Sequence, residues 1–453
     1  MSARSAAPIT AASPVTFSDP LPSGVDVVIV GAGVSGMMSA LYLRRAGLSV
    51  FVVEKGRVAG EQSSRNWGWI RQLGRDEAEL PIMMEASRLW EQIDGETGNA
   101  TGFRRTGIMY LASTEKEMEE RAKWLDVARR HQLDVRAIDG DAVADRIDTG
   151  TGGKRWAGAV WSPTDARGEP WVAVPAVAQL AHSEGVGIRE NCAIRTLETE
   201  AGHLSGVHTE HGFIAASQVV VAGGAWTSLL LRNCGVSLPQ LSVRSTVMRT
   251  APIPEVYDGA ALDEELALRR REDGSYTVSA LDAHDLMIGP DSFRHLRTWL
   301  PTAAKVLGQT RFLPAAPKHY PDAWGTARRW GAGDETPFER CRVLDPKPNE
   351  NRMGVLKRRF AARFPSLGEP EITHAWAGMI DAMPDVVPVV DRVPGLEGLI
   401  VATGMSGHGF GIGPGFGKVV ATVATGRPTG HDISRFRFSR FTDGSKLIPG
   451  PAL

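Results

Sequence analysis

Three glycines near the N-terminus, Gly31, Gly33 and Gly36, have the G-x-G-x-x-G spacing that lets a backbone turn lie against a phosphate group. They follow an apolar run at 27–30, which is typical of a strand buried on both faces. Gly31 permits a tight turn, Gly33 lets the backbone approach a pyrophosphate, and Gly36 lets the next helix pack closely. Glu54 ends the next apolar run, 18 residues after Gly36, where it can accept hydrogen bonds from a ribose. This stretch predicts a strand–turn–helix–strand unit that binds a dinucleotide.

A second glycine-rich run lies near the C-terminus and has almost no side chains. Its glycines alternate with other residues: Gly407, Gly409, Gly411, Gly413, Gly415 and Gly417. An apolar stretch at 399–402 precedes the run and a helical stretch at 418–425 follows it, which argues against a flexible linker. Such a backbone can approach a flat aromatic cofactor closely. A helix from Phe416 onward would direct its positive N-terminal end at that cofactor.

The composition narrows the class of protein. The chain has 453 residues, of which 42% are hydrophobic, and suits two domains or one elaborate domain. Its net charge of −1 does not favour nucleic acid as a partner. The cysteines Cys192, Cys234 and Cys341 lack metal or disulfide spacing, which suits a reducing, cytoplasmic setting. The sequence contains no run of 18 apolar residues, so it predicts no transmembrane helix. Residues 1–24 are expected to be a disordered leader, with a transit segment as the alternative, and residues 431–453 a basic tail packed on the body.

The apolar patterns predict an α/β chain with two kinds of domain. Helical spacing occurs at 76–95, 114–131 and 171–185. Strand patterns occur at 186–189, 193–197, 203–208, 213–216 and 217–222, with a hairpin turn at 210–212. Strand patterns at 242–250, 275–280 and 286–289, with a helix near 291–307, predict a separate antiparallel sheet with covering helices. We expect a nucleotide-binding domain from 25–80, 155–240 and 366–430, and an α+β domain from 81–154 and 241–365.

Four blocks, in order, resemble the FAD-dependent D-amino acid oxidase and glycine oxidase superfamily, which includes D-amino acid dehydrogenases. They are GAGVSG with Glu54, SSRNWG, GVGIRENCAIRTLE with GFIAASQVVVAGGAW, and ATGMSGHGFGIGPGFG. The resemblance covers about residues 25–430. It implies a Rossmann-like FAD-binding domain of the GR2 type and a substrate domain with an antiparallel sheet. It also implies non-covalent FAD, because relatives that attach flavin covalently use a cysteine and none follows Cys341.

The resemblance assigns cofactor-binding roles by position. At the pyrophosphate and adenosine end they fall on Gly31, Gly33, Val34, Ser35, Gly36, Glu54, Lys55, Ile194, Ala222, Gly223 and Trp226. Along the ribityl chain and the flavin ring they fall on Ser63, Ser64, Arg65, Asn66, Trp67, Gly68, Gly404, Ser406, Gly407, His408, Gly409 and Phe410. His408 is either an ordinary turn residue or an electrostatic group near the flavin. No residue is assigned to a metal.

The expected substrate side departs from the family pattern. Many members place an arginine a few residues after Trp-x-Gly, where it binds the substrate carboxylate with two hydrogen bonds. Here the stretch is AWAGMIDAMPD, with Ile380 at the arginine position and Asp381 after it. Asp381 is a candidate to bind a substrate ammonium, or else it caps the loop before Pro384. Arg71 is the first replacement candidate, because strand-like alternation would put it on one face with Trp67 and Trp69.

Weaker candidates for the carboxylate are Arg244 and the run 269–271, for which pairing with the acids at 263–265 is the alternative. The family implies hydride transfer from a carbon that bears an amine to flavin N5, and hydrolysis of the resulting imine. The electron acceptor is left open among oxygen, a quinone and a partner protein. The rival functions are an aromatic-hydroxylase monooxygenase, an NAD-dependent dehydrogenase, and a flavin subunit of a heteromeric opine- or sarcosine-oxidising complex.

Overall fold

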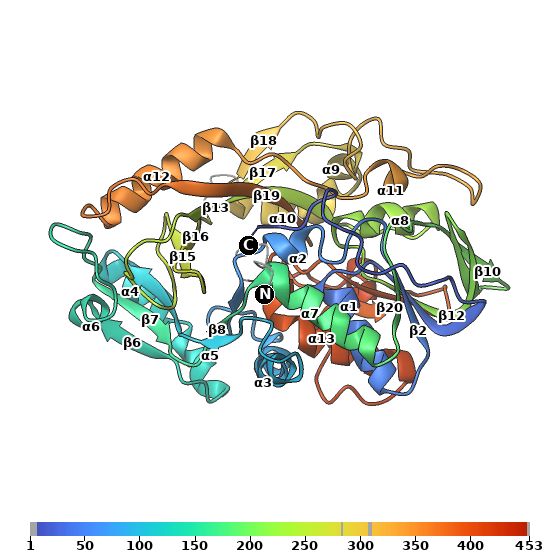
Figure 1. Ribbon diagram of the computed structural model, residues 1–453, viewed down its shortest axis with the longest axis horizontal. Coiled ribbons are helices and arrows are strands. Elements are labelled where there is room, and N and C mark those ends of the chain that lie inside the picture. The colour runs from blue at the N-terminus through green and yellow to red at the C-terminus, as the bar shows by residue number, and fades with distance from the viewer. Residues whose placement is uncertain (1–6, 282–283, 307–309, 451–453) are drawn as a thin grey trace.

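The computed structural model describes residues 7–281, 284–306 and 310–450, and its fold is α/β with two large sheets. In Figure 1, one sheet arches from the lobe with α4–α6 at the left across the top, and the other lies below it at the right with α1, α7 and α13. The end of the predicted helix at 307, and residues 1–6 and 451–453 of the predicted termini, lie outside the described residues.

The first sheet has eight strands and carries the predicted glycine turn. Its path is β10 (Ile194–Glu200), β11 (His203–Thr209), β12 (Gly212–Val221), β1 (Gly24–Val30), β2 (Val50–Val53) and β9 (Gly187–Arg189), with β21 (Leu399–Thr403) beside β12 and β20 (Val389–Arg392) beside β21. The central part of this sheet is parallel and consists, in spatial order, of β9, β2, β1, β12 and β21. Their side chains alternate between two cores: Val27 and Ile29 pack on one face, and Val28 packs on the other.

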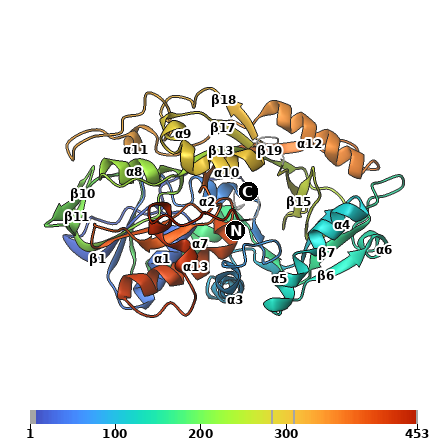
Figure 2. The same cartoon turned by 180° about the vertical axis from the view of Figure 1, so that it is seen from behind.

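Helices cover one face of this sheet closely. They are α1 (Val34–Arg45), α7 (Pro170–Ser183) and α13 (Gly409–Thr425), with α3 (Leu80–Glu96) against α13. Both Figure 1 and Figure 2, which shows the opposite side, place α3 next to α13. The other face is covered by the β10–β11 hairpin, η1 (Gly224–Trp226) and α8 (Thr227–Asn233).

The second sheet has ten strands and is mainly antiparallel. Its path is β18 (Thr310–Leu313), β17 (His284–Met287), β13 (Leu241–Thr250), β16 (Tyr276–Ser279), β15 (Ala267–Arg270), β14 (Ala260–Leu262), β5 (Ile108–Ala112), β7 (Gly158–Ser162) and β6 (Arg136–Asp139), with β19 (Ile372–Ala382) along β13. The pairs β14–β5 and β17–β18 are parallel. Strands β7 and β19 were expected in the nucleotide domain; β7 pairs with β5 and β19 with β13, so both extend the second sheet.

The remaining elements are short or peripheral. The helices are α2 (Gln62–Arg65), α4 (Glu115–Ala122), α5 (Leu125–Arg130), α6 (Gly140–Ala144), α9 (Pro290–Arg294), α10 (Leu296–Val306), α11 (Pro337–Arg340) and α12 (Glu350–Arg363), with η2 (Ser434–Phe436) and η3 (Phe438–Phe441) in the tail. A small third sheet joins β3 (Trp69–Ile70), β8 (Ala166–Arg167) and β4 (Arg104–Arg105). Two predicted helices are each split, 114–131 into α4 and α5, and 291–307 into α9 and α10.

The N-terminal segment differs from the expected disordered leader. Phe17 is only 4% exposed, and its N–H donates to Glu190 Oε2 at 3.0 Å. The Ile9 N–H donates to Ser64 Oγ at 3.1 Å, and Arg65 Nη2 donates to the Ile9 carbonyl at 3.1 Å. The described part of this segment is therefore packed against α2 and the first sheet, because its backbone finds buried hydrogen-bond partners there.

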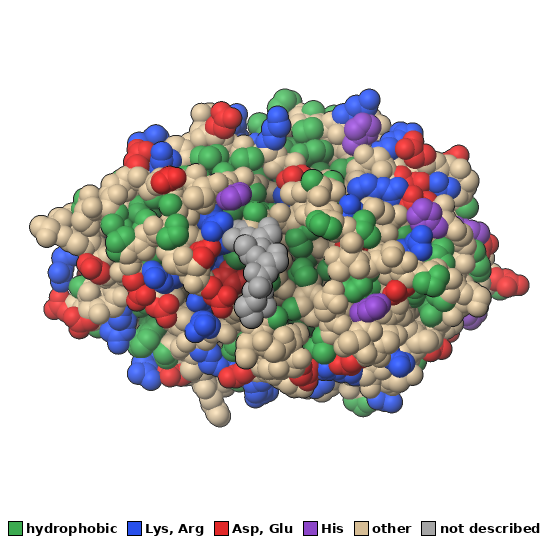
Figure 3. All heavy atoms as spheres, in the orientation of Figure 1, with side chains coloured by type: hydrophobic (Ala, Val, Ile, Leu, Met, Phe, Trp, Pro, Cys, Tyr) green, Lys and Arg blue, Asp and Glu red, His purple; other side chains and the backbone are tan. Residues whose placement is uncertain are grey.

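The C-terminal tail packs on the body, as the sequence predicts. Phe436 and Phe438 are buried, and Arg440 forms two hydrogen bonds with the buried carboxylate of Asp385, at 2.8 and 3.1 Å. On the face in Figure 3, acidic and basic side chains are interspersed, in line with the net charge near zero. Among the helices that the structure describes, none has the length and apolar character to cross a bilayer.

Candidate functional site

A cavity lies at the carboxyl ends of β1, β2, β12 and β21. In open sheets with parallel strands, ligands bind in this crevice. The predicted cofactor residues that line it are Gly31, Gly33, Val34, Ser35, Glu54, Lys55, Ser63, Asn66, Ile194, Ala222, Gly223, Trp226, Gly407, Gly409 and Phe410, together with Asp381. The structure thus brings segments far apart in the sequence to one cavity.

The N-terminus of α1 faces the cavity without a side-chain cap. Gly33 is the N-cap, and the first turn has no acidic residue. The Val34 N–H donates to Ser63 Oγ at 2.9 Å. The N–H groups of Ser35 and Gly36 have no partner within the helix, since the first turn of any helix leaves them unpaired. These donors and the positive end of the helix dipole suit a pyrophosphate.

Gly36 does not line the cavity but sets the position of this helix. A Cβ atom built on Gly36 would lie 1.9 Å from the Gly31 carbonyl oxygen. Gly31 itself has φ of +100°, a left-handed value that favours glycine. The turn and the helix start are therefore closely packed backbone, as the glycine spacing predicts.

Glu54 fixes the other side of this turn. Its Oε2 accepts from the Ala32 N–H at 2.8 Å, and its Oε1 accepts from the Gly56 N–H at 2.7 Å. Burial raises the pKa of this carboxyl to about 6. Each carboxylate oxygen has a second lone pair, so Glu54 can also accept from ribose hydroxyls in the cavity.

Glu61 is a cavity residue that sequence reasoning missed. It lies where Lys55 and Trp226 meet: Lys55 Nζ is 2.6 Å from Glu61 Oε1, and Trp226 Nε1 donates to Glu61 at 3.1 Å. Lys55 Nζ also lies 4.5 Å from the centroid of the Trp226 ring. The three side chains fix one another at the β2 end of the cavity, and these contacts also orient the Trp226 ring.

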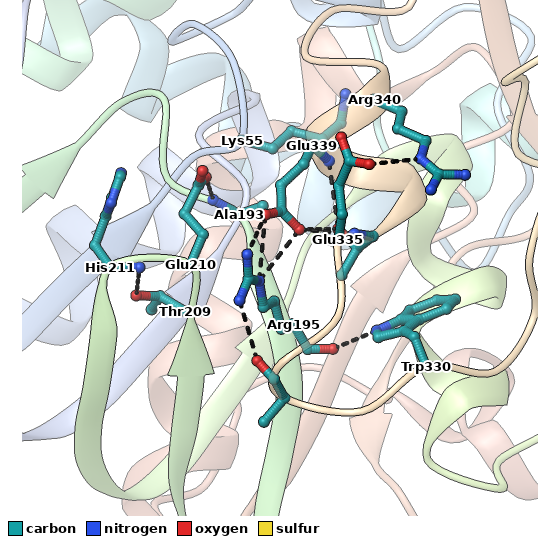
Figure 4. A network of polar contacts seen from close by, with 12 residues as sticks. Lys55, Ala193, Arg195, Thr209, Glu210, His211, Trp330, Glu335, Glu339 and Arg340 are labelled. Carbon is teal, nitrogen blue, oxygen red and sulfur yellow. Dashed lines mark hydrogen bonds and ion pairs between the residues drawn. The ribbon is translucent and has the colours of Figure 1, made fainter.

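A segment from the expected substrate domain closes the same end. Phe338, Arg342 and Val343 line the cavity, although nothing in their local sequence predicts a nucleotide contact. Figure 4 shows how α11 is attached to the β10–β11 hairpin: Arg195 Nη2 is 2.6 Å from Glu339 Oε1, and Trp330 Nε1 donates to the Arg195 carbonyl at 2.6 Å. These contacts connect two segments more than 130 residues apart.

The glycines near the C-terminus serve helix packing more than cofactor approach. Helix α13 begins at Gly409, not at Phe416, and of the six alternating glycines only Gly407 and Gly409 line the cavity. A Cβ atom on Gly413 would lie 2.7 Å from Val34 Cγ2, and one on Gly417 would lie 2.6 Å from the Met38 backbone carbon. This glycine stripe thus allows α1 and α13 to lie close together.

The other glycines of α13 face different neighbours. A Cβ atom on Gly411 would lie 3.1 Å from the Trp69 carbonyl oxygen, and one on Gly415 would lie 2.6 Å from the Ile82 carbonyl oxygen. The helix is therefore packed between α1 on one side and β3 and α3 on another. Its N-terminus, with no acidic residue in the first turn, faces the cavity.

Asp381 anchors the turn that leads into α13. Its Oδ2 accepts from the N–H groups of Gly404 and Met405, at 2.8 and 3.2 Å, and from Thr403 Oγ1 at 3.4 Å. Gly404 and Ser406 in this turn both have positive φ, of +70° and +46°. Burial raises the pKa of Asp381 to about 6, against the opposing effect of these hydrogen bonds. The Asp381 carboxylate therefore accepts hydrogen bonds from the 403–405 turn. It does not cap the loop before Pro384, which was one of the two roles expected from the sequence.

His408 lies beneath this turn and does not line the cavity. It is 5% exposed, and its Nδ1 is 3.8 Å from Glu79 Oε1. Arg75 Nη1 is 3.3 Å from Glu79 Oε2, and Arg75 Nη2 donates to the His408 carbonyl at 3.1 Å. Burial lowers the pKa of His408 below its usual range, so the ring is neutral at pH 7.

The predicted cofactor residues Ser64, Arg65, Trp67 and Gly68 do not line the cavity and lie behind the residues that do. Arg65 is buried and donates to the carbonyls of Ile9 and Gly60, both at 3.1 Å. Ser64 accepts from the N-terminal segment, as described above. The Trp67 and Trp69 rings meet edge to face at 5.4 Å, and Gly68 has φ of +76°. These residues support the loop that carries Ser63 and Asn66.

The predicted substrate arginines do not gather in one place. Arg71 Nη1 donates to the Leu73 carbonyl at 2.6 Å, and its guanidinium lies 5.8 Å from the Tyr110 ring centroid. Arg244 pairs with Asp285 at 2.6 Å, away from the cavity wall. Arg269 is fully buried and pairs with both oxygens of Glu169, at 3.0 and 3.1 Å.

The expected surface pairing of the run 269–271 with the acids at 263–265 is wrong for Arg269. Asp263 is paired with Arg363 at 2.7 Å, and Glu264 with Lys154 at 3.0 Å. Glu169 lies at the start of α7, and Arg269 lies on β15. The Arg269–Glu169 pair therefore joins the two sheet systems in the interior, which the local sequence did not indicate.

The cavity fits FAD on the observations above. Two uncapped helix N-termini face it, glycine backbone replaces side chains at both, and a tryptophan and a carboxylate stand at the β2 end. Ser35, Glu54 and Trp226 would hold the adenosine diphosphate part, and Gly407, Gly409 and Phe410 the flavin part.

The comparisons with known proteins agree with this fit. The profile described as "FAD dependent oxidoreductase" matches residues 26–423. The chain is 26% identical to a D-amino acid dehydrogenase of Paramagnetospirillum magneticum, over 92% of this chain and 99% of that protein. It is 27% identical to a 4-methylaminobutanoate oxidase of Paenarthrobacter nicotinovorans, over 94% of this chain but only 47% of that longer protein. The structure of an L-amino acid deaminase from Proteus myxofaciens has a TM-score of 0.89, 28% identity, and coverage of 96% and 97% of the two chains.

Replacing Gly36 by alanine should impair cofactor loading. The added Cβ would collide with the Gly31 carbonyl, so α1 must move away from the turn. We expect the affinity for FAD to fall at least about tenfold, which is about 1.4 kcal/mol. Titration of apo-protein with FAD, followed by flavin fluorescence, measures this. Gly95→Ala, in the exposed part of α3 with open space around it, is the control and should load normally.

Replacing Asp381 by asparagine should change how stability depends on pH. The folded-state pKa is raised, so the contribution of Asp381 is fully present below about pH 4 and is lost as pH rises through about 6. The loss amounts to up to about 3 kcal/mol, and asparagine does not titrate. Urea unfolding of the apo-protein at pH 4 to 7 measures this. As pH rises, the free energy of unfolding of the variant should increase relative to that of the wild type. A difference that is the same at every pH would contradict this.

Proposed function

Because the chain belongs to the family of FAD dependent oxidoreductases, we propose that it oxidises the C–N bond of an amino acid or a related secondary amine. In this reaction a hydride would pass from the carbon that bears the nitrogen to N5 of the bound flavin, and water would hydrolyse the resulting imine. The observation that carries this proposal is the position of the cavity: its α13 end borders β19, a strand of the second sheet. Substrate bound against that sheet would meet the flavin ring there.

When bound, FAD supplies the hydride acceptor. The protein contributes the N-terminal end of α13, whose unpaired N–H groups and dipole would stabilise negative charge on a flavin bound there. Asp381 keeps these groups in place by holding the 403–405 turn. A positioning role explains its three contacts better than the binding of a substrate ammonium, since all three use the oxygen that faces the turn.

The FAD is proposed to be held without a covalent bond to cysteine. All three cysteines are described, and none lines the cavity. Burial raises the pKa of both Cys192 and Cys341 to about 11, which keeps these thiols protonated and weakly nucleophilic.

The substrate is proposed to carry a carboxylate. The names of the three relatives described above each specify an amino acid or an aminobutanoate. Ile380 takes the expected arginine position, and a Cβ atom on Gly407 would lie 3.9 Å from Ile380 Cγ2, so an apolar side chain lies beside Gly407 where many family members have a guanidinium. We propose Arg71 for the carboxylate, because it is only half-buried and follows β3, which packs on α13.

Anaerobic reduction of the FAD-loaded protein tests the reaction class. Pools of D-amino acids, L-amino acids, N-alkyl amino acids and simple amines are added in turn, and the flavin absorbance is followed. We expect one amino acid pool to bleach the flavin, and air to show whether oxygen reoxidises it. Failure of all four pools to bleach a protein that holds FAD would contradict C–N oxidation by this chain alone.

Replacing Arg71 by glutamine should then raise KM for the substrate so identified at least about tenfold, which corresponds to the loss of a charge-assisted hydrogen bond. The decarboxylated analogue should be oxidised equally by wild type and variant. Arg121→Gln is the matched control, because Arg121 lies 6.0 Å from the same Tyr110 ring. Equal KM changes in the two variants would exclude the proposed role of Arg71.

A further inference from the structure

The segment that contains α9 and α10 has its polar and apolar sides reversed. Asp291, His295 and Thr302 are buried against the body of the protein. Phe293, Leu296 and Leu300 face outward and are 61%, 50% and 55% exposed. The spacing of three and four residues puts these apolar side chains on one side of the helical segment. A helix on a protein that has no partner on that side normally shows the opposite arrangement.

Trp324 extends this surface. It is 57% exposed, and its ring centroid lies 6.0 Å from that of Phe293. We call Phe293, Leu296, Leu300 and Trp324 the apolar ridge. Of the eight large apolar side chains that are exposed among the described residues, four belong to the ridge. Single exposed apolar residues are ordinary on a surface, whereas a cluster of this kind marks an interaction site.

The underside of the ridge is attached to the body by specific hydrogen bonds. Trp299 Nε1 donates to the Pro239 carbonyl at 2.9 Å, and Thr302 Oγ1 donates to the Pro384 carbonyl. Asp291 forms ion pairs with Arg232 and with Arg294, the latter at 2.6 Å. These contacts hold the polar side inward, so the ridge cannot turn to bury itself without breaking buried hydrogen bonds and ion pairs.

Basic side chains border the ridge. A surface pocket is lined by Arg232, Arg294, Arg328 and Arg329, and no acidic side chain is among its described lining residues. Two acids partner these four arginines, Asp291 and Asp322. Arg297, between Leu296 and Leu300, is also exposed, and the described positions 292–303 include no acid. The border of the ridge is therefore positively charged.

We propose that the apolar ridge is a docking surface for an anionic lipid bilayer. Leucine and aromatic side chains beside arginines are the composition of helices that lie in the interface of a membrane, with the apolar side among the acyl chains. Arginines at the border then meet lipid phosphates, and anionic headgroups add electrostatic attraction. Binding of this kind is peripheral, and it goes beyond the proposed oxidation of amines.

Vesicle flotation with the full-length, FAD-loaded protein tests the proposal. The probes are vesicles of phosphatidylcholine alone and of phosphatidylcholine with phosphatidylglycerol. We expect binding to the mixed vesicles that weakens as sodium chloride rises, because salt screens the charges. The double substitution Leu296→Glu and Leu300→Glu should lower the bound fraction at least tenfold, and Arg297→Glu should lower it severalfold.

Ile448→Glu is the matched control, because Ile448 is 60% exposed but is not part of the ridge. This variant should bind as the wild type does, and all variants should keep their FAD content and melting temperature. The proposal is overturned if the wild type binds to neither kind of vesicle, or if the ridge variants bind as well as Ile448→Glu does. It is also overturned if the wild type is a dimer that the double substitution dissociates, since the ridge would then join two copies of the chain.

Discussion

The close contact between α1 and α13 is the constraint on which the site depends. Val34 and Met38 of α1 meet Gly413 and Gly417 of α13, where even a methyl group would collide. A glycine inside a helix costs about 0.5–1 kcal/mol relative to alanine. The absence of side chains at these glycines permits two helix N-termini to face one cavity, that of α1 beside β1 and that of α13 beside β21. Either N-terminus alone would make only half of a dinucleotide site.

Strand β19 extends this arrangement to the second sheet. It pairs with β13 along its length, and its residue Asp381 lines the cavity. Trp376 Nε1 donates to the Arg65 carbonyl at 2.9 Å, Ile380 lies beside Gly407, and Asp381 binds the 403–405 turn. One strand thus connects the substrate sheet to α2 and to the start of α13. Movement of that sheet would therefore displace the 403–405 turn at the α13 end of the cavity.

The sequence predicts best what local chemistry determines. The G-x-G-x-x-G turn, Glu54 and the apolar runs specify a strand–helix–strand unit by spacing alone, and the structure shows it. The start of α13 was misplaced because glycines and Pro414 indicate a loop, whereas helix packing overrides their low propensity. Glu61 and Phe338 were missed because they reach the cavity through long-range contacts. The pairing of β19 with β13 could not be predicted, because a buried strand pattern does not reveal which sheet it joins.

The most direct test of the account is a crystal structure of the protein loaded with FAD. We predict one FAD in the cavity, with its pyrophosphate at the N–H groups of Ser35 and Gly36 and its ring between Gly407 and the β19 side of the cavity. Adenine beside α13, flavin beside Trp226, or FAD bound outside this cavity would contradict the account.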